Sequence, residues 1–170
     1  MRELTLHDGR HVFVRPVLPR DEALLRQAVE QADPDTLRRR FLGGRPPQDD
    51  EDFRRLVCVD YDRRLAVVAF GPDGKGAGIA RYEAIGDSDT AEVAVAVDPM
   101  WRHVGLATAL LRILGEGAVR HRIRHLTAEF FADNLDVAEM LGEAALPYRS
   151  ARDAAGVVSA DIVLPRELPP

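Results

Sequence analysis

The chain has 170 residues, 46% of them hydrophobic, which suits one domain over residues 1–170 with a sizeable core. The net charge of −5 argues against nucleic acid as a partner, and the single cysteine excludes an internal disulfide and a cysteine-rich metal cluster. The chain lacks a signal-peptide apolar core and any apolar run of membrane-spanning length, so we expect a cytoplasmic protein without membrane contact.

A hairpin and three helices are expected in the first third of the chain. Strands at 4–6 and 11–17 flank Asp8-Gly9, a dipeptide typical of hairpin turns. A helix follows from 19 to about 32, as the spacing of its apolar residues indicates. Asp33 can then cap a second short helix, with Pro34 at its first position.

Two charged runs in this region each allow two interpretations. Arg38, Arg39 and Arg40 on the second helix favour a solvated face over an anion site. The acidic residues 49–52 precede a third helix, where they complement its dipole. The alternative for these acids is an electronegative rim that attracts a cationic acceptor.

The rest of the chain alternates strands with helices. Strands at 64–70, 78–85 and 92–97 should form a meander, because short Gly- and Asp-containing turns separate them. The remaining expected elements are an apolar helix after Gly105, a strand at 125–131, a helix at 134–146, strands at 148–151 and 156–164, and a frayed tail at 165–170. This order indicates a mixed α/β or α+β fold with a largely antiparallel first half.

One segment carries the strongest functional signal. The alternating Val and Ala residues of 92–97 predict a buried strand, which Asp98-Pro99 ends. A turn through Gly105 then leads into an apolar helix whose first N–H groups have no partner within the helix. These donors, together with the helix dipole, predict a phosphate-binding turn. The alternative is an ordinary strand-turn-helix with a glycine in its turn.

The pattern Arg-x-x-Gly-x-Ala from Arg102 to Ala107 resembles the acyl-CoA signature of the GNAT superfamily of N-acyltransferases. The element order is similar too, which implies an α+β GNAT fold: a central, mixed but mostly antiparallel sheet of about seven strands with helices on both faces. Three further segments resemble Pat-type bacterial protein lysine acetyltransferases: Asp-Gly-Arg with Val-Arg-Pro-Val, Arg-Arg-Arg-Phe, and Ala-Arg-Tyr.

This resemblance implies acetyl-CoA as co-substrate and no metal. In the family, backbone groups of the central strand bind the pantetheine arm and polarise the acyl carbonyl, which here means Val95, Ala96 and Val97. The residues expected at the diphosphate are Arg102, His103, Val104, Gly105, Leu106, Ala107 and Thr108, with the Arg102 side chain adding charge. Asn134 stands where the family often has a coenzyme-contacting asparagine; the alternative is a helix N-cap.

Glu92 is the first candidate for a general base. It shares a strand face with Ala94 and Ala96, whose small side chains leave a trough for a ligand. An amine must lose a proton before it can attack a thioester, and burial would raise the pKa of such a carboxylate toward neutrality. In Pat-type enzymes the glutamate of a similar Ala-Glu-Val-Ala run is the base. The alternatives are an arginine-paired Glu92 on the solvent side of the sheet, and Glu129 as the base.

Other candidates for chemistry are weaker. The family often has a tyrosine general acid one and a half to two turns after the asparagine, but Met140 and Leu141 stand there, and Tyr148 lies too far along. We therefore expect no tyrosine acid. His121 and His125 are expected to be solvated basic residues, since no carboxylate near them in sequence completes a metal set.

The sequence thus predicts acetyl transfer from acetyl-CoA to a primary amine in a ternary complex, with a protein lysine side chain as acceptor. Two alternatives stay open: acetylation of a small amine such as a polyamine, aminoglycoside or amino acid, and a non-catalytic acyl-CoA-binding module. Members of the family often dimerise, so a homodimer is an expectation that the sequence itself does not fix.

Overall fold

The computed structural model describes residues 1–165, and part of the tail expected at 165–170 lies outside them. The strands are β1 (Arg2–Thr5), β2 (His11–Pro16), β3 (Arg64–Phe70), β4 (Gly76–Ala84), β5 (Thr90–Val97), β6 (His125–Phe131), β7 (Tyr148–Arg152) and β8 (Val157–Val163). The helices are α1 (Glu22–Gln31), α2 (Pro34–Arg40), α3 (Asp50–Val57), α4 (Leu106–Arg120) and α5 (Leu135–Glu143), with short 3₁₀ turns at Pro19–Asp21 and Pro99–Trp101.

All eight strands form one sheet in the order β1-β2-β3-β4-β5-β6-β8-β7. The expected meander of β3, β4 and β5 is confirmed, and every neighbouring pair is antiparallel except β5 with β6. The sheet has one strand more than the roughly seven expected, because both arms of the opening hairpin pair within it.

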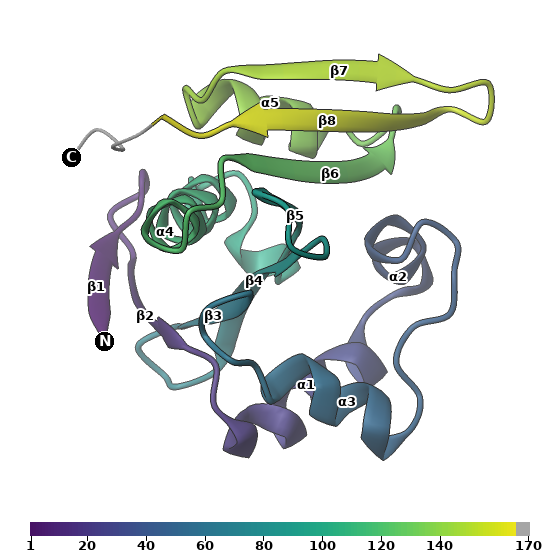
Figure 1. Cartoon of the computed structure of the whole chain (residues 1–170). Coiled ribbons are helices and arrows are strands. Elements are labelled where there is room, and N and C mark those ends of the chain that lie inside the picture. Colours follow the sequence, from purple (N-terminus) through teal and green to yellow (C-terminus); the bar gives the residue numbers. More distant parts are fainter. Residues whose placement is uncertain (166–170) are drawn as a thin grey trace.

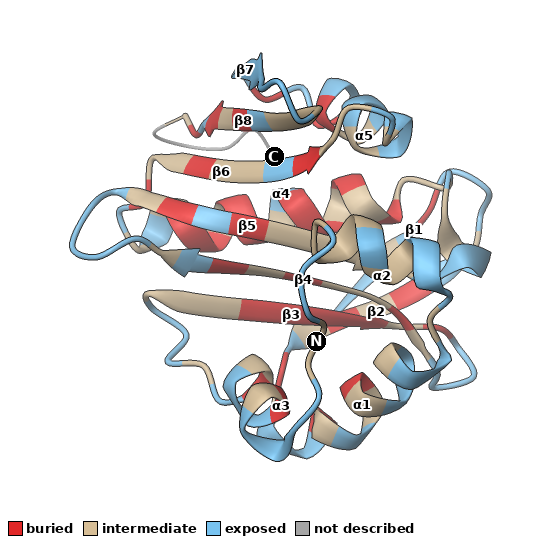
Figure 2. Ribbon diagram, turned by 90° about the vertical axis from the view of Figure 1, so that its right-hand side faces the viewer, coloured by how far each residue is buried: buried red, intermediate tan, exposed pale blue. Residues whose placement is uncertain are grey.

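Helices cover both faces of the sheet, as expected (Figure 1). On one face α4 buries Leu106, Leu110, Leu111 and Leu114 completely, since these residues recur on one side of the helix. They belong to the larger core, which also takes in Leu141 of α5. Buried residues accordingly gather along the strands and on α4 behind them (Figure 2).

A smaller core lies on the opposite face, where α1 and α3 pack on β3. Leu25, Phe53 and Val57 from these helices meet Ala66 and Val68 of the strand. The acidic start of α3 acts as expected of a helix N-terminus, because the Asp49 side chain accepts a hydrogen bond from the backbone N–H of Asp52. Asp33 caps α2 in the same way, through Thr36.

The central strands β5 and β6 pair only briefly. Their parallel register runs from Thr90 with His125 to Glu92 with Thr127, and the two strands separate beyond it. The amide edge of β5 past Glu92 therefore has no strand beside it within residues 1–165. None of the helices in the described part of the chain combines the length and apolar character needed to cross a bilayer.

Candidate active site

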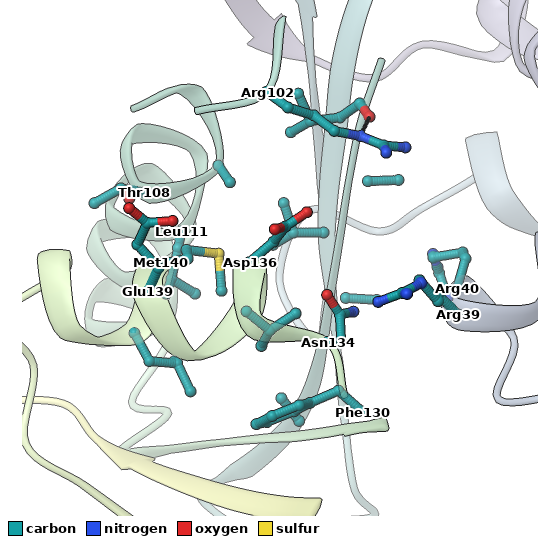
Figure 3. Close-up of a pocket in the computed structure, with 18 of the residues that line it drawn as sticks. Arg39, Arg40, Arg102, Thr108, Leu111, Phe130, Asn134, Asp136, Glu139 and Met140 are labelled. Carbon is teal, nitrogen blue, oxygen red and sulfur yellow. Dashed lines mark hydrogen bonds between the residues drawn. The ribbon is translucent and has the colours of Figure 1, made fainter. Parts of the chain in front are cut away.

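A cavity of about 680 Å³ opens where β5 and β6 separate. Its walls come mainly from β5, β6, the start of α4, α5 and α2, with Trp101 of the second 3₁₀ turn and Ile162 of β8 added. In Figure 3, α4 and α5 present Thr108, Leu111 and Met140 on one side, while α2 brings Arg39 and Arg40 from the other. The cavity is therefore built by segments far apart in sequence. It lies between helices α4 and α5 on one side and α2 on the other.

The backbone of β5 alternates between its two neighbours, and this alternation decides which amides face the cavity. The Asp98 N–H, just after β5, donates to the Ala77 carbonyl of β4 at 3.0 Å. The Ala91 carbonyl instead accepts from the Thr127 hydroxyl on β6 at 3.4 Å. Since successive residues of a strand direct their N–H and C=O groups to opposite edges, Val95 and Val97 present theirs to the cavity. Ala96 directs its amide to β4, so this N–H is not available to a ligand in the cavity.

The turn before α4 supplies further free donors. The backbone N–H groups from His103 to Thr108 have no acceptor within residues 1–165, as expected for a helix that begins at Leu106. Gly105, Leu106, Ala107 and Thr108 all line the cavity. Leu106 is buried and can offer a ligand only its backbone, whereas the buried Thr108 hydroxyl already donates to Glu143 Oε2 at 2.9 Å.

Two features require a glycine at position 105: its backbone conformation and the adjacent ring of His7, a contact that the sequence does not reveal. Its φ is +84°, a left-handed conformation that glycine adopts without strain. A Cβ at this position would lie 2.7 Å from the His7 ring, because the hairpin turn docks here and the His7 N–H donates to the Val104 carbonyl at 3.1 Å. The space beside the Gly105 Cα is therefore filled by His7 of the same chain, and the absence of a side chain serves this packing contact.

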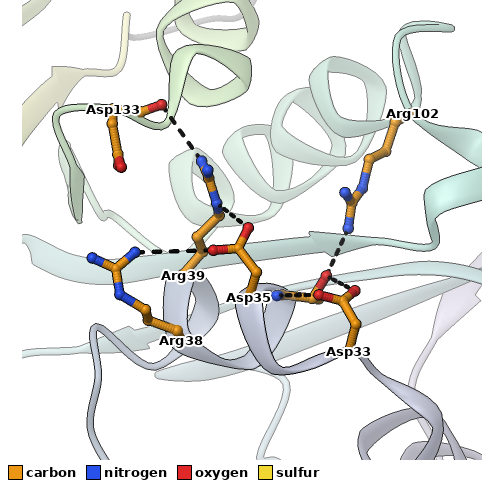
Figure 4. Close-up of polar contacts among 7 residues, drawn as sticks. Asp33, Asp35, Arg38, Arg39, Arg102 and Asp133 are labelled. Carbon is orange, nitrogen blue, oxygen red and sulfur yellow. Dashed lines mark hydrogen bonds and ion pairs between the residues drawn. The ribbon is translucent and has the colours of Figure 1, made fainter.

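Arg102 also differs from expectation in where its charge lies. Its Nη2 donates to the Thr36 hydroxyl of α2 at 3.0 Å (Figure 4). Its Nε donates to the Val97 carbonyl oxygen at 3.4 Å. The guanidinium therefore bridges the cavity to α2 instead of resting at the start of α4. Its contact with a diphosphate stays a prediction.

The turn before α4 faces acidic side chains of α5. The His103 ring nitrogens lie 4.0 Å from an Asp136 carboxylate oxygen and 3.8 Å from one of Glu139, both on α5. An anionic group bound at the turn would compete with these two carboxylates for His103. Sequence reasoning missed the acidic wall of α5, since nothing local shows which way its side chains face.

Asn134 occupies the N-cap position of α5, but its side chain makes no capping hydrogen bond. It lines the cavity instead and points toward its centre in Figure 3. Met140 lines the cavity as well, where the family often has its tyrosine. None of the three tyrosines reaches it: Tyr61 and Tyr82 donate to the Val17 and Asp62 carbonyls, and Tyr148 lies on β7.

Glu92 lines the cavity on the face turned toward α2. Its side chain is exposed, so the burial expected from the sequence is not found, and it forms no ion pair within residues 1–165. Its cross-strand partner is Glu83, which Arg81 Nη2 holds at 3.2 Å. Arg81 is thus taken by Glu83, and Glu92, which lies opposite another negative charge, has no ion-pair partner within residues 1–165.

Glu129, the alternative base, also lines the cavity and is exposed. Glu92 and Thr127 are register partners, so Glu129 projects from the same sheet face two residues further along β6. Ser159 Oγ lies 3.5 Å from its Oε1. The structure thus brings both candidate carboxylates to one cavity, from two strands that diverge.

The arginine triplet divides between solvent and cavity. Arg38 is exposed and pairs loosely with Asp35, as a solvated face requires. Arg39 and Arg40 line the cavity, contrary to the favoured interpretation. Each residue of a helix turns by about 100°, so three consecutive arginines could not all face solvent on a helix that packs against the sheet. Burial lowers the pKa of the Arg40 guanidinium, and the neighbouring Arg81 lowers it further.

The two histidines after α4 contact different carboxylates, His121 with Asp62 and His125 with Asp161, each at 2.9 Å. Residues 1–165 contain no group of three or more His, Cys, Asp or Glu side chains placed to hold a metal ion. The Asp133 carbonyl accepts a hydrogen bond from Arg39 at 3.5 Å, and Asn134 takes the N-cap position of α5.

A protein-family model and a curated relative show which family this chain is similar to. The model of the acetyltransferase (GNAT) family matches residues 34–143. An acetyltransferase of Pseudomonas aeruginosa is 33% identical over 125 residues, which cover 72% of this chain and 67% of that protein.

Solved structures of acetyltransferases are similar to this fold. The GNAT domain of S. lividans PAT superposes with a TM-score of 0.85 at 27% identity, covering 96% of each chain. Spermidine N-acetyltransferase from Vibrio cholerae, solved with CoA and spermine, has a TM-score of 0.72 over 90% of this chain and 95% of its own; at 11% identity it shows the fold alone. With the family model covering most of the chain, this protein belongs to the GNAT family of acetyltransferases.

Proposed function

We propose that this protein transfers the acetyl group of acetyl-CoA to a protein lysine side chain, with Glu92 as the general base. One observation carries the proposal: the free amides of β5 and of the α4 turn open onto the same cavity as the unpaired Glu92. The family uses acetyl-CoA, and the lysine acceptor rests on the sequence resemblance to Pat-type enzymes and on the similarity to the S. lividans PAT domain.

The residues fit a coenzyme laid along the cavity. The N–H groups of the α4 turn would hold the diphosphate, and the edge of β5 would hold the pantetheine arm. An N–H of Val95 or Val97 aimed at the thioester oxygen would stabilise the negative charge that develops there. Asn134 has a free side-chain amide at the same cavity and would contact the arm.

The reaction removes two protons from the acceptor nitrogen and exchanges one bond. Glu92, directly or through a water, takes the first proton from the lysine ammonium, and the neutral nitrogen attacks the thioester carbon. The C–N bond forms as the C–S bond breaks, and the nitrogen, positively charged after the attack, releases its second proton to solvent. Since the three tyrosines lie outside the cavity, the sulfur leaves as a thiolate and takes its proton from solvent.

The Glu92→Gln variant tests the base. We expect kcat to fall by about 10²- to 10⁴-fold, because the amide cannot accept the proton. Acetyl-CoA binding measured by calorimetry should stay near the wild-type value, since the coenzyme contacts are backbone groups elsewhere. Glu129→Gln is the matched control and should keep most of the turnover; a larger loss there than in Glu92→Gln would assign the base to Glu129.

The acceptor class is tested by incubating the enzyme with labelled acetyl-CoA and a cell lysate. Label should enter protein and be found on lysine ε-nitrogens by mass spectrometry. The enzyme has a single lysine, Lys75, in the β3–β4 loop, so a Lys75→Arg variant removes side-chain self-labelling from the result. Label found only on small amines would replace the lysine acceptor by a small-molecule one.

A further inference from the structure

A second cavity, of about 500 Å³, lies beside the first on the α3 side of β4 and β5. The two cavities share Arg40, Phe41, Glu92 and Ala94 in their walls. Glu92 therefore stands at the junction between the coenzyme cavity and a separate space. An acceptor amine that approaches Glu92 from the side opposite the coenzyme would pass through this second cavity.

The second cavity is rich in arginine although the whole chain carries a net charge of −5. Five guanidinium groups line it, from Arg40, Arg45, Arg55, Arg64 and Arg81, against the carboxylates of Asp52, Glu83 and Glu92. Of the acidic residues 49–52 only Asp52 lines this cavity, so the electronegative rim considered from the sequence stays an untested alternative. Asp52 itself is engaged by Arg45 at 2.7 Å.

Protein carboxylates neutralise only some of these arginines. Arg64 pairs with Asp60 at 3.2 Å, and Arg81 pairs with Glu83. Arg40 and Arg55 form no ion pair or hydrogen bond to a carboxylate within residues 1–165. The Arg40 guanidinium lies only over the Phe41 ring, 5.0 Å from its centroid.

Among the five arginines of the second cavity, Arg40 bears most directly on ligand binding, because it is partly buried and has no carboxylate partner within residues 1–165. Desolvation by burial lowers its pKa, and repulsion from Arg81 acts in the same direction, whereas the negative charge of Glu92 opposes this shift in part. Burial likewise lowers the pKa of Arg81, and the charges of Arg64 and Arg55 lower it further, against the opposing effect of the Glu83 and Glu92 carboxylates. A half-buried guanidinium among other guanidiniums gains strongly from a bound carboxylate, which accepts two parallel hydrogen bonds from it.

We infer that the second cavity is the acceptor subsite and that it selects a lysine flanked by an acidic residue, whose carboxylate binds Arg40 with Arg55 beside it. This inference rests on the proposed function, since it specifies the peptide around the acceptor lysine. The acidic side chain would fix the peptide while the lysine reaches Glu92, the wall shared by both cavities. Arg40 is thus a specificity residue with no part in the proton transfer.

Matched peptides test the inference. Each pair holds one lysine and differs only by Glu against Gln, or Asp against Asn, at one position within two residues of the lysine. In at least one pair the acidic peptide should have a kcat/KM about ten-fold or more above its neutral partner, as a charge-assisted hydrogen bond of this kind gives. This ratio should fall toward one in Arg40→Gln.

Two further variants keep the test decisive. Arg55→Gln, an exposed change on α3, should lower the ratio even if Arg40→Gln folds poorly. Arg38→Gln is the matched control on α2, because Arg38 lines neither cavity, and it should keep the wild-type ratio. An Arg40→Glu variant should reverse the preference toward peptides with a basic residue beside the lysine.

The outcomes separate the two proposals. Equal rates for every acidic and neutral pair, or a preference unaffected by both Arg40→Gln and Arg55→Gln, would overturn the acidic subsite and leave lysine acetylation standing. If no peptide is acetylated while a small amine is, the lysine acceptor fails and the subsite inference fails with it.

Discussion

Gly105 shows how a single residue can serve the fold and the site together. Its left-handed φ of +84° starts α4 with its N–H groups free, and the His7 ring fills the space beside its Cα. Both constraints act on any side chain at this position. The glycine therefore holds the hairpin turn against the helix whose amides we assign to the diphosphate.

We expect Gly105→Ala to lose about 1–3 kcal/mol of unfolding free energy, through backbone strain and the clash with His7. Acetyl-CoA affinity should weaken as the turn shifts. Urea denaturation and calorimetry measure the two effects. Adding His7→Ala should recover the steric part only, and Gly142→Ala, whose Cβ meets open space, is the control that should be tolerated. A fully stable Gly105→Ala with normal affinity would contradict this account.

Glu92 illustrates what a residue's neighbours add to its sequence context. The alternation of 92–97 correctly places it on the face of Ala94 and Ala96. Its opposition to Glu83 is visible only in the register of β4 and β5. That register leaves Glu92 without an arginine partner within residues 1–165, since Arg81 holds Glu83.

At the scale of elements, the brief pairing of β5 with β6 creates the cavity. Two parallel strands that paired along their full length would bond every amide of the β5 edge. Separation after Glu92 and Thr127 leaves those amides free, while the opposite edge of β5 stays paired with β4 up to Val97. Along this part of β5, residues whose amides bond to β4 thus alternate with residues whose amides have no strand to bond to.

This difference predicts an exchange pattern. The amide hydrogens of Val95 and Val97 should exchange rapidly with deuterium in the free protein and become protected when acetyl-CoA is added. Those of Ala94 and Ala96, which face β4, should be protected in both states and serve as internal controls. Residue-resolved hydrogen exchange measures all four. Unchanged exchange at both valines would remove the β5 edge from coenzyme binding.

Helix α2 closes the open side of this cavity through few polar contacts. Arg102 reaches its Thr36 and Arg39 reaches the Asp133 carbonyl, so α2 is tied to segments on both sides of the separation (Figure 4). Its residues are not fully buried. The helix therefore owes its position to side chains contributed by other elements, which its own seven residues cannot specify.

At the scale of the molecule, the layer of α1 and α3 is fastened to the sheet by the smaller core and by one buried ion pair. Arg15 of β2 donates to both carboxylate oxygens of Asp21 at 2.7 and 2.8 Å, and the Leu18 N–H bonds the same carboxylate. Asp21 is 5% exposed. The hydrogen bonds from Arg15 and Leu18 lower the pKa of Asp21.

We expect Asp21→Asn to reduce the unfolding free energy by about 2–3 kcal/mol, because Arg15 loses its partner in a half-buried position. Since the folded-state pKa is lowered, the contribution of Asp21 is complete above the unfolded-state value of about 3.9 and is lost as the pH falls through the folded-state pKa. Denaturant titrations between pH 7 and acid should show the two proteins converging. Asp50→Asn, which breaks the exposed pair with Arg26, is the control and should change stability little. A constant difference down to strongly acidic pH would exclude this linkage.

The sequence by itself determined the features that arise from near neighbours. The meander, the capping of α2 by Asp33, and the strand-turn-helix from Glu92 into α4 follow from periodicity, turn residues and capping, which act over a few residues. These local rules sufficed to place the chain in its family, whose model matches residues 34–143.

Only the tertiary structure decided what the site presents to a substrate. The separation of β5 from β6, the His7 ring against Gly105, the bridge from Arg102 to Thr36 and the inward turn of Arg40 all join residues distant in sequence. The sequence favoured a solvated arginine triplet because helical periodicity shows that residues face different ways, but not which neighbour each one meets. Long-range packing sets those encounters, and through them the charge around the amine acceptor.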